Sequence, residues 1–235
     1  MKPLQQIIDR ISQEKFINSS RVVEIVKKAS VSSSDLLPYA NFHHPLNESY
    51  GRAKIFEGEN FGVYVMSWNP GDFTAIHSHG HTQWGAVLFL SNTNHRIYTA
   101  KDKSVKLIDD QTICAGSLIP IREGFVHAMG NLSNEPFQSL HIYGASNYSS
   151  PTNTDSLVYQ LEYERMRITD GRAFINIDDS YAKKDIPGLV ADDETMMDYL
   201  QIIRPFYQRA GDYEMVNHLD CLITLKEPNN KNICP

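Results

Sequence analysis

The sequence predicts a mainly β protein, built as a sandwich or a barrel with helices at its N-terminal end. From Arg52 to about Tyr148, short runs rich in β-branched and aromatic residues alternate with breaks rich in Gly, Pro, Asn and Asp. Many short strands at regular spacing are typical of sandwiches and barrels. Residues 3–30 differ: their apolar side chains recur at helical spacing, which predicts two short helices.

The last third of the chain predicts a mixed α/β extension. Its clearest element is a helix that has an acidic start after Asp192 and stops at Gly211. We expect residues 1–150 to form one domain that includes the N-terminal helices. Residues 151–235 are expected to form a C-terminal extension packed on that domain. The sequence gives neither the role of this extension nor the oligomeric state.

Composition argues against several kinds of partner. The chain has 235 residues and a formal net charge of −6. Nucleic acids and anionic membranes attract clustered Lys and Arg, so neither is an expected partner. No apolar run approaches the ~20 residues that a membrane span needs. The three cysteines are odd in number and widely spaced, which predicts no disulfide framework and a cytoplasmic location.

Three histidines occupy alternate positions in the stretch PGDFTAIHSHGHTQWG. They are His77, His79 and His81. Residues two apart on a strand face the same side, so either adjacent pair can direct two imidazoles to one point. Neutral imidazole is the commonest metal ligand in proteins. The alternation therefore predicts a metal site with two possible registers.

The surroundings of these histidines resemble the two sequence motifs of the cupin barrels. Gly71, five residues and His-x-His match the first motif. The stretch GSLIPIREGFVHAMGN resembles the second motif, although its gap before Pro120 is shorter and its gap before Gly124 is longer. In this family two antiparallel strands bring the doublet and the later histidine together. The resemblance implies a jelly-roll barrel in which His127 joins the doublet as a metal ligand.

The chain lacks the fourth ligand that many cupins carry. A glutamate often follows the doublet by a few residues, whereas Gln83 stands here and no Asp or Glu lies between His79 and Asn92. We therefore expect three neutral imidazoles, with open positions for substrate and oxygen. Without a carboxylate ligand the metal keeps more positive charge, which favours an anionic ligand such as a thiolate.

Two further motifs resemble the cysteine dioxygenase family of thiol dioxygenases. SLHIY at residues 139–143 resembles the strand that places a tyrosine beside iron, and YGR at residues 50–52 resembles a pair that binds the carboxylate of cysteine. The resemblance covers about residues 3–150. It implies Fe(II) held by His77, His79 and His127, a substrate carboxylate bound by Arg52 and Tyr50, and Tyr143 oriented through His141 and Ser139.

The register of the doublet stays open at this level. The Gly71 spacing and the distance from Arg52 favour His77 with His79. The stretch HGHTQWG, however, also resembles bacterial members of the family, whose doublet is followed closely by Trp-Gly. That register would select His79 with His81.

Other departures from the family concern the substrate. Mammalian members link a cysteine to the active-site tyrosine, but Trp84 and Gly85 stand near that position here, so we expect a bacterial type without the crosslink. HIYGAS lacks the Ser-Pro-Pro that often follows the tyrosine in cysteine-specific members. It looks more like relatives that oxidise 3-mercaptopropionate, although those usually lack the equivalent of Arg52.

The expected function is oxidation of a small thiol carboxylic acid, L-cysteine being favoured, to its sulfinic acid with both atoms of O₂. This would be a step of sulfur amino acid metabolism. One alternative is 3-mercaptopropionate or another thiol as the substrate. A second alternative, from another class, is a metal-binding cupin without turnover.

The remaining histidines and the first cysteine are expected to have ordinary structural roles. His43 and His44 precede a proline and predict a loop, and His95 lies among turn-forming residues. Cys114 precedes a predicted strand and is expected to be a small buried residue.

Overall fold

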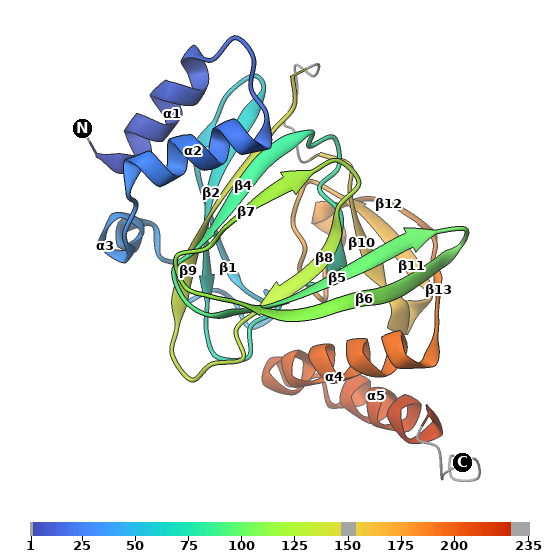
Figure 1. Cartoon of the computed structure of the whole chain (residues 1–235). Helices are drawn as coiled ribbons and strands as arrows, with labels where there is room; N and C mark the ends of the chain where they lie inside the picture. The colour runs from blue at the N-terminus through green and yellow to red at the C-terminus, as the bar shows by residue number, and fades with distance from the viewer. Residues whose placement is uncertain (1, 147–153, 227–235) are drawn as a thin grey trace.

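The structure, a computed structural model, describes residues 2–146 and 154–226. Two β-sheets face each other and form a barrel, with helices packed outside it (Figure 1). All strand pairs between neighbours are antiparallel except β6 with β13. The predicted mainly β barrel with N-terminal helices and a C-terminal α/β region is confirmed.

The first sheet has five strands and the second has eight. In spatial order the first sheet contains β1 (Gly51–Glu57), β2 (Phe61–Trp68), β9 (Phe137–Gly144), β4 (Trp84–Phe89) and β7 (Leu118–Arg122). The second contains β12 (Ala182–Pro187), β11 (Arg165–Thr169), β10 (Ser156–Gln160), β3 (Ile76–His77), β8 (Val126–Gly130), β5 (Thr93–Lys101), β6 (Ser104–Ile113) and β13 (Val190–Ala191).

Strands β2 and β9 are buried at every residue because both of their faces are covered. Alternate side chains of β9 point to opposite faces. Leu140 and Ile142 pack in the apolar core beneath the N-terminal helices. Ser139, His141 and Tyr143 form hydrogen bonds with one another on the other face. One strand thus joins the apolar core to the candidate site.

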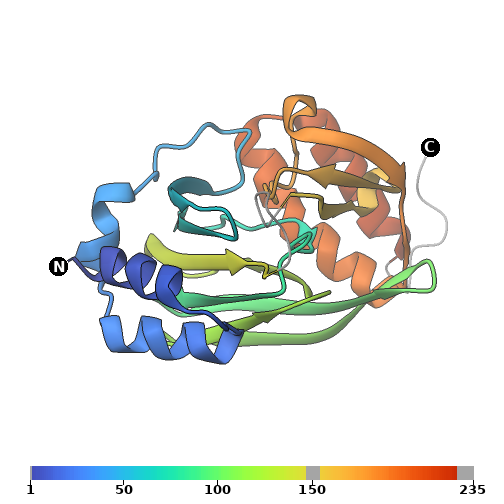
Figure 2. The same cartoon turned by 90° about the horizontal axis from the view of Figure 1, so that it is seen from above.

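The N-terminal helices cover the outer face of the first sheet. They are α1 (Pro3–Gln13) and α2 (Ser19–Ala29), as the sequence predicts, followed by α3 (Ser33–Leu36) and the 3₁₀ turn η1 (Leu37–Tyr39). Figure 2 shows α1 and α2 side by side against the barrel. Asn18 caps α2 by accepting a hydrogen bond from the backbone N–H of Arg21, and this fixes the start of the helix.

The C-terminal region contributes directly to the second sheet. Strand β10 pairs with β3, so Val158 lies opposite His77. Helices α4 (Asp193–Ala210) and α5 (Tyr213–Lys226) then pack on the outer face of this sheet (Figure 1). As predicted, Asp192 caps α4 and Gly211 ends it, with a φ of 76° that glycine adopts readily.

Shorter elements complete this region: η2 (Leu161–Tyr163) between β10 and β11, and η3 (Asp179–Tyr181) before β12. The boundary expected at residue 150 stays a prediction. Among the described residues, no helix is long and apolar enough to cross a membrane.

Two cysteines differ from expectation. Cys114 is a free thiol and is exposed, so the prediction that it is buried was wrong; it lies between β6 and β7, where the chain turns before the next strand. Cys221 on α5 is disulfide-bonded, which the wide spacing of the cysteines did not predict.

Candidate metal centre and active site

Three buried imidazoles converge inside the barrel. His77 on β3 lies directly opposite His127 on β8 in an antiparallel pair, and His79 follows two residues later. One nitrogen from each ring lies within 4.8 Å of the others, and the Nε2 atoms of His79 and His127 are 3.1 Å apart. The strand pairing of the two cupin-like motifs therefore brings together the three predicted ligands.

All three imidazoles are neutral near pH 7. Burial lowers the pKa of His77 to about 4 and holds the pKa values of His79 and His127 well below the usual 6.5. Neighbouring histidines add to this effect for His79 and His127, because two cations at close range repel. A neutral imidazole offers a lone pair, which is the form that a metal ion binds.

The closest pair of nitrogens has the spacing of two ligands on one metal ion. With metal–nitrogen distances of about 2.0–2.1 Å and an angle of about 90–110°, two ligand nitrogens lie roughly 2.9–3.4 Å apart. The separation between His79 and His127 is within that range. In addition, Nδ1 of His77 is 3.0 Å from the backbone carbonyl of Ala75, a bond that would leave Nε2 of His77 to face the ion.

His81 points elsewhere. Its Nε2 lies 3.0 Å from a carboxylate oxygen of Asp155, in a partly exposed ion pair. His81 is not part of the three-histidine group. Of the two registers that the sequence leaves open, the geometry favours His77 with His79.

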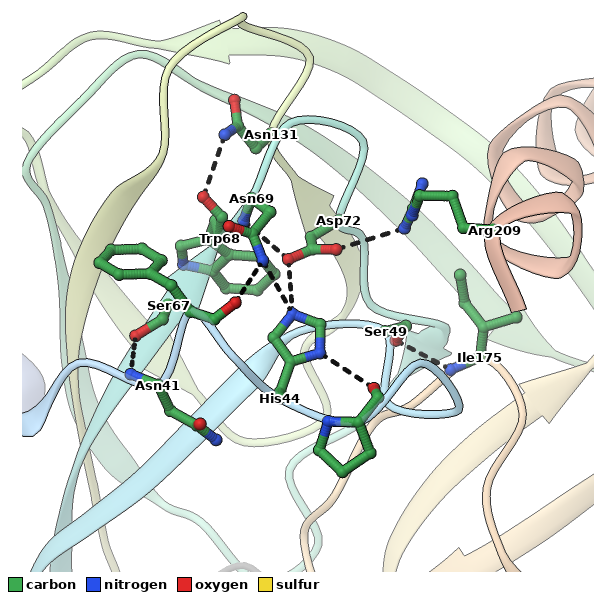
Figure 3. Close-up of polar contacts among 12 residues, drawn as sticks. Asn41, His44, Ser49, Ser67, Trp68, Asn69, Asp72, Asn131, Ile175 and Arg209 are labelled. Carbon is green, nitrogen blue, oxygen red and sulfur yellow. Dashed lines mark hydrogen bonds and ion pairs between the residues drawn. The ribbon is translucent and has the colours of Figure 1, made fainter. Parts of the chain in front are cut away.

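The turn before the doublet is held by a buried carboxylate. Figure 3 shows Asp72 between His44 and Arg209, and the two side chains approach it to 3.0 and 3.2 Å. The backbone N–H of Asn69 also donates to Asp72, at 2.7 Å. His44 was expected to lie in an ordinary loop, but it links the segment before β1 to this turn, and Arg209 adds a contact from α4.

The two motifs are also tied together by their backbones. Gly71 donates its N–H to the carbonyl of Asn131, and Asn131 donates its N–H to the carbonyl of Asp72, both at 2.8 Å. Gly71 has a φ of 81°, a conformation that favours glycine. These motif residues position the ligand strands and do not themselves reach the histidines.

A hydrogen-bonded chain ends at Tyr143. The indole N–H of Trp68 donates to Ser139 at 2.8 Å, Ser139 Oγ is 2.7 Å from His141 Nε2, and His141 Nδ1 is 2.7 Å from the Tyr143 hydroxyl. Indole only donates, so Trp68 occupies a lone pair of Ser139 Oγ and leaves the hydroxyl hydrogen free to donate to His141. His141 is neutral, with a pKa lowered to about 3 by burial, and its single N–H then donates to Tyr143.

When His141 donates to Tyr143, the tyrosine hydroxyl hydrogen points away from His141. Burial raises the pKa of Tyr143, so the hydroxyl stays protonated. The Tyr143 ring stacks on His79 with 5.0 Å between ring centres. Tyr143 and the three histidines line one cavity of about 20 Å³, room for roughly one water molecule.

Tyr50 and Arg52, the two residues predicted to bind the substrate, line different pockets. Tyr50 lines the histidine cavity, and its hydroxyl accepts a hydrogen bond from the backbone N–H of Ala173 at 3.1 Å. Arg52 lines a neighbouring pocket of about 340 Å³, where its guanidinium lies 4.3 Å from the ring centre of Tyr64. Arg52 Nε is buried, with no hydrogen-bond partner among the described residues.

Sequence reasoning missed two residues near this site. Arg172, from the segment after β11, lines the same pocket as Arg52. His95 is not a turn residue: it lies on β5 and is buried, and its Nε2 is 2.7 Å from Nδ1 of His127. No local pattern could have found either contact, because each depends on strands far apart in sequence.

The position opposite the tyrosine carries no side chain. Gly85 on β4 pairs with Tyr143 on β9. Gly85 has no thiol, so no thioether can form at this strand pair, and the expected bacterial type stays a prediction.

Comparison with known proteins decides the family. The family model described as cysteine dioxygenase type I matches residues 1–152, more than half of the chain. The chain belongs to the cysteine dioxygenase type I family. Membership in this family makes it a cupin thiol dioxygenase in general class, and the three-histidine group is in place for the metal of that class.

Solved structures similar to this cysteine dioxygenase family member include two barrels. One is an uncharacterized conserved protein with a double-stranded β-helix domain from Klebsiella pneumoniae, at 22% identity, covering 48% of this chain and 89% of that chain with a TM-score of 0.37. The other is the cupin domain of Cnp3 from Schizosaccharomyces pombe, at 14% identity, covering 47% and 72% of the two chains with a TM-score of 0.37. These likenesses concern the fold alone.

Proposed function

We propose that the protein is a non-haem Fe(II) thiol dioxygenase that converts a small thiol carboxylic acid, L-cysteine being favoured, and O₂ to the sulfinic acid. The observation that carries this proposal is one cavity that holds three neutral imidazoles and a tyrosine hydroxyl, with no carboxylate among its described lining residues. A metal ion with such ligands keeps its positive charge and favours a thiolate.

The three histidines and the tyrosine that line the cavity each have a role in this proposal. His77, His79 and His127 would hold the ion. Fe(II) bound there would supply the redox chemistry by which both atoms of O₂ pass to sulfur. Tyr143 keeps its proton and would donate a hydrogen bond into the cavity, and the chain from Trp68 through Ser139 and His141 supports that orientation.

The pocket beside the cavity would bind the substrate carboxylate. Lys54 is paired with Glu57, and Arg172 with Asp170, whereas Arg52 has no ion-pair partner among the described residues. The pocket therefore keeps positive charge, and a guanidinium can grip a carboxylate with two parallel hydrogen bonds.

The positions of the two arginines suggest that both meet the acid. Burial, and next the charge of Arg52, lower the pKa of Arg172, so the two guanidinium groups repel each other. A carboxylate between them would relieve this repulsion. The histidine cavity is small, so the thiol end of a short acid would enter it while the acid end stays in the pocket.

A second candidate substrate is 3-mercaptopropionate. No described residue that lines the histidine cavity is acidic, so none is placed to pair with the ammonium group of cysteine. An acid thiol without an amine avoids that need. A metal-binding cupin without turnover is the alternative from another class, and only an activity measurement separates it. The cytoplasmic location and a role in sulfur amino acid metabolism stay predictions.

The test is oxygen uptake by Fe(II)-loaded protein on a panel of cysteine, 3-mercaptopropionate and cysteamine, together with metal analysis. We expect bound iron, sulfinate formation from one or both acids, and poor turnover of cysteamine, which lacks the carboxylate. Iron binding without oxidation of any thiol would support the non-catalytic alternative and overturn the proposal.

A further inference from the structure

His95 contacts the metal-binding group from behind. Its Nε2 lies 2.7 Å from Nδ1 of His127, while Nε2 of His127 faces His79 at 3.1 Å. His95 belongs neither to the ligand group nor to the described lining of the cavity. It therefore contacts a ligand on the side away from the ion that the three histidines would hold.

The contact between His95 and His127 determines which ring nitrogen carries the proton in each imidazole when a metal ion is bound. If Nε2 of His127 binds a metal ion, its proton must be on Nδ1, because a neutral imidazole carries only one N–H. Among the described residues His95 is the hydrogen-bond partner of that nitrogen, so Nε2 of His95 must be the acceptor. His95 then carries its own proton on Nδ1. The chain of imidazoles has one arrangement compatible with metal binding.

This arrangement leaves His95 with an unsatisfied group. Its Nδ1 is buried and has no hydrogen-bond partner among the described residues. The rings of Phe89 and Phe125, centred 6.3 and 5.9 Å from that of His95, offer it no conventional acceptor. A buried, unpaired N–H is destabilising, and an apolar side chain at this position would avoid that cost. The packing of β5 therefore gives no reason for a histidine here.

An imidazole is also an uncommon hydrogen-bond acceptor for a metal-binding histidine. A metal-binding histidine most often donates its second N–H to a carboxylate, a backbone carbonyl or a water. Because Nε2 of His95 must accept this hydrogen bond, the acceptor here is a neutral ring. A neutral acceptor orients His127 without adding negative charge beside the ion, which preserves the attraction for an anionic substrate.

We propose that His95 is a positioning residue, which fixes the tautomer and the ring orientation of His127 so that its Nε2 is ready to bind the ion. This inference rests on the proposed function, since it takes His127 as a metal ligand. It assigns to β5 a role in the metal site that the two cupin-like motifs do not include.

The test measures metal binding directly, with Co(II) as the probe under anaerobic conditions. His95→Phe keeps a flat ring and removes the acceptor, and we expect it to weaken Co(II) binding by ~10- to 100-fold. The visible absorption spectrum of bound Co(II), which reports ligand geometry, is expected to shift. His218→Gln is the matched control, because His218 is exposed on α5, and it should bind Co(II) as the unmodified protein does.

A second pair of variants keeps the test valid if His95→Phe does not fold. The Oε1 atom of Gln can reach the place of Nε2, whereas Asn is one methylene shorter. We expect His95→Gln to recover most of the affinity and His95→Asn to lose it. Equal affinities for these two variants, or an unchanged affinity and spectrum in His95→Phe, would overturn the inference.

The outcome separates this inference from the proposed function. If His127→Ala binds Co(II) as tightly as the unmodified protein, the ligand assignment itself is wrong. If His127→Ala loses the ion while His95→Phe keeps it unchanged, only the role of His95 is wrong.

Discussion

Two buried polar clusters of this chain differ in how completely their hydrogen bonds are made. In the C-terminal region, Glu162 accepts hydrogen bonds from the hydroxyls of Tyr199 and Tyr207, the latter at 3.0 Å. In the barrel, the described residues include three buried side-chain atoms without a well-formed hydrogen bond: Arg52 Nε, His79 Nδ1 and His95 Nδ1. All three lie in or beside the histidine cluster.

The difference separates structure from function. Buried polar groups are normally hydrogen-bonded, so an exception needs an explanation. The Glu162 cluster joins η2 to α4, and both of these hydrogen bonds lie across that contact. In the histidine cluster, by contrast, the described residues leave buried polar atoms without hydrogen-bond partners. For His79, burial is the largest effect and lowers the pKa, while a contact with the backbone of Phe125 raises it.

The largest effect is expected from the metal ligands. His77→Ala removes one of three imidazoles, so we expect it to lose most bound iron and nearly all thiol oxidation. His81→Ala removes a contact with Asp155 outside the three-histidine group and is expected to keep both. Metal content and oxygen uptake are the measurements. The reverse pattern would mean that His79 and His81 form the doublet.

The next effect concerns the hydrogen-bonded chain. Tyr143→Phe deletes the hydroxyl and keeps the ring that stacks on His79. We expect unchanged iron content and a kcat lower by ~10²–10⁴-fold, the usual contribution of hydrogen-bonding or acid–base help. Steady-state kinetics with the best thiol of the panel measures it. An unchanged kcat would make the chain a structural feature, like the Glu162 cluster.

The carboxylate pocket is expected to have a smaller effect. Arg52→Ala removes a charge-assisted bond of about 1.5–3 kcal/mol, so kcat/KM for acid thiols should fall by roughly 10- to 150-fold. Cysteamine has no carboxylate and should be a poor substrate before and after the change. Oxidation of an acid thiol by Arg52→Ala at the unmodified rate would contradict the role of the pocket.

A variant of Arg172 tests the same pocket, again through kcat/KM for acid thiols. We expect Arg172→Ala to cost ~10-fold or less, since Arg172 is already paired with Asp170. Arg204→Ala is the control, because Arg204 pairs with Asp220 on the far side of α4 from the sheet. Equal effects of the two variants would place Arg172 outside the substrate site.

The satisfied cluster should affect stability and leave turnover unchanged. Burial raises the pKa of Glu162 to about 7 from 4.5, so the folded state keeps a proton that the unfolded state releases. The stabilisation is complete below pH 4.5 and is lost as pH rises through 7. At ~1.4 kcal/mol per pKa unit, the loss totals about 3 kcal/mol.

Glu162→Gln should remove this pH dependence of the free energy of unfolding. Urea unfolding of both proteins between pH 5 and 8 measures it, with the exposed Glu194→Gln as control. If the two variants show the same slope with pH, Glu162 does not titrate as its burial indicates.

The sequence predicts the barrel from its series of short strands, and strand alternation predicts that Ser139, His141 and Tyr143 share one face of β9. For the candidate ligands alternation leaves two registers open, and His127 is added only by the resemblance to the cupin motifs. His95 and Arg172 could not be predicted, since their contacts depend on which strands become neighbours. His95 meets His127 across the pair of β5 and β8, and Arg172 reaches Arg52 from a segment beyond the family match.

The most direct test of the account is isotope labelling of the product. Fe(II)-loaded protein would oxidise the best acid thiol of the panel under ¹⁸O₂, and mass spectrometry would determine the label in the product. The account predicts a sulfinic acid that carries two labelled oxygen atoms, formed with one O₂ consumed per thiol. A product with one or no labelled oxygen, or a disulfide in place of the sulfinate, would contradict it.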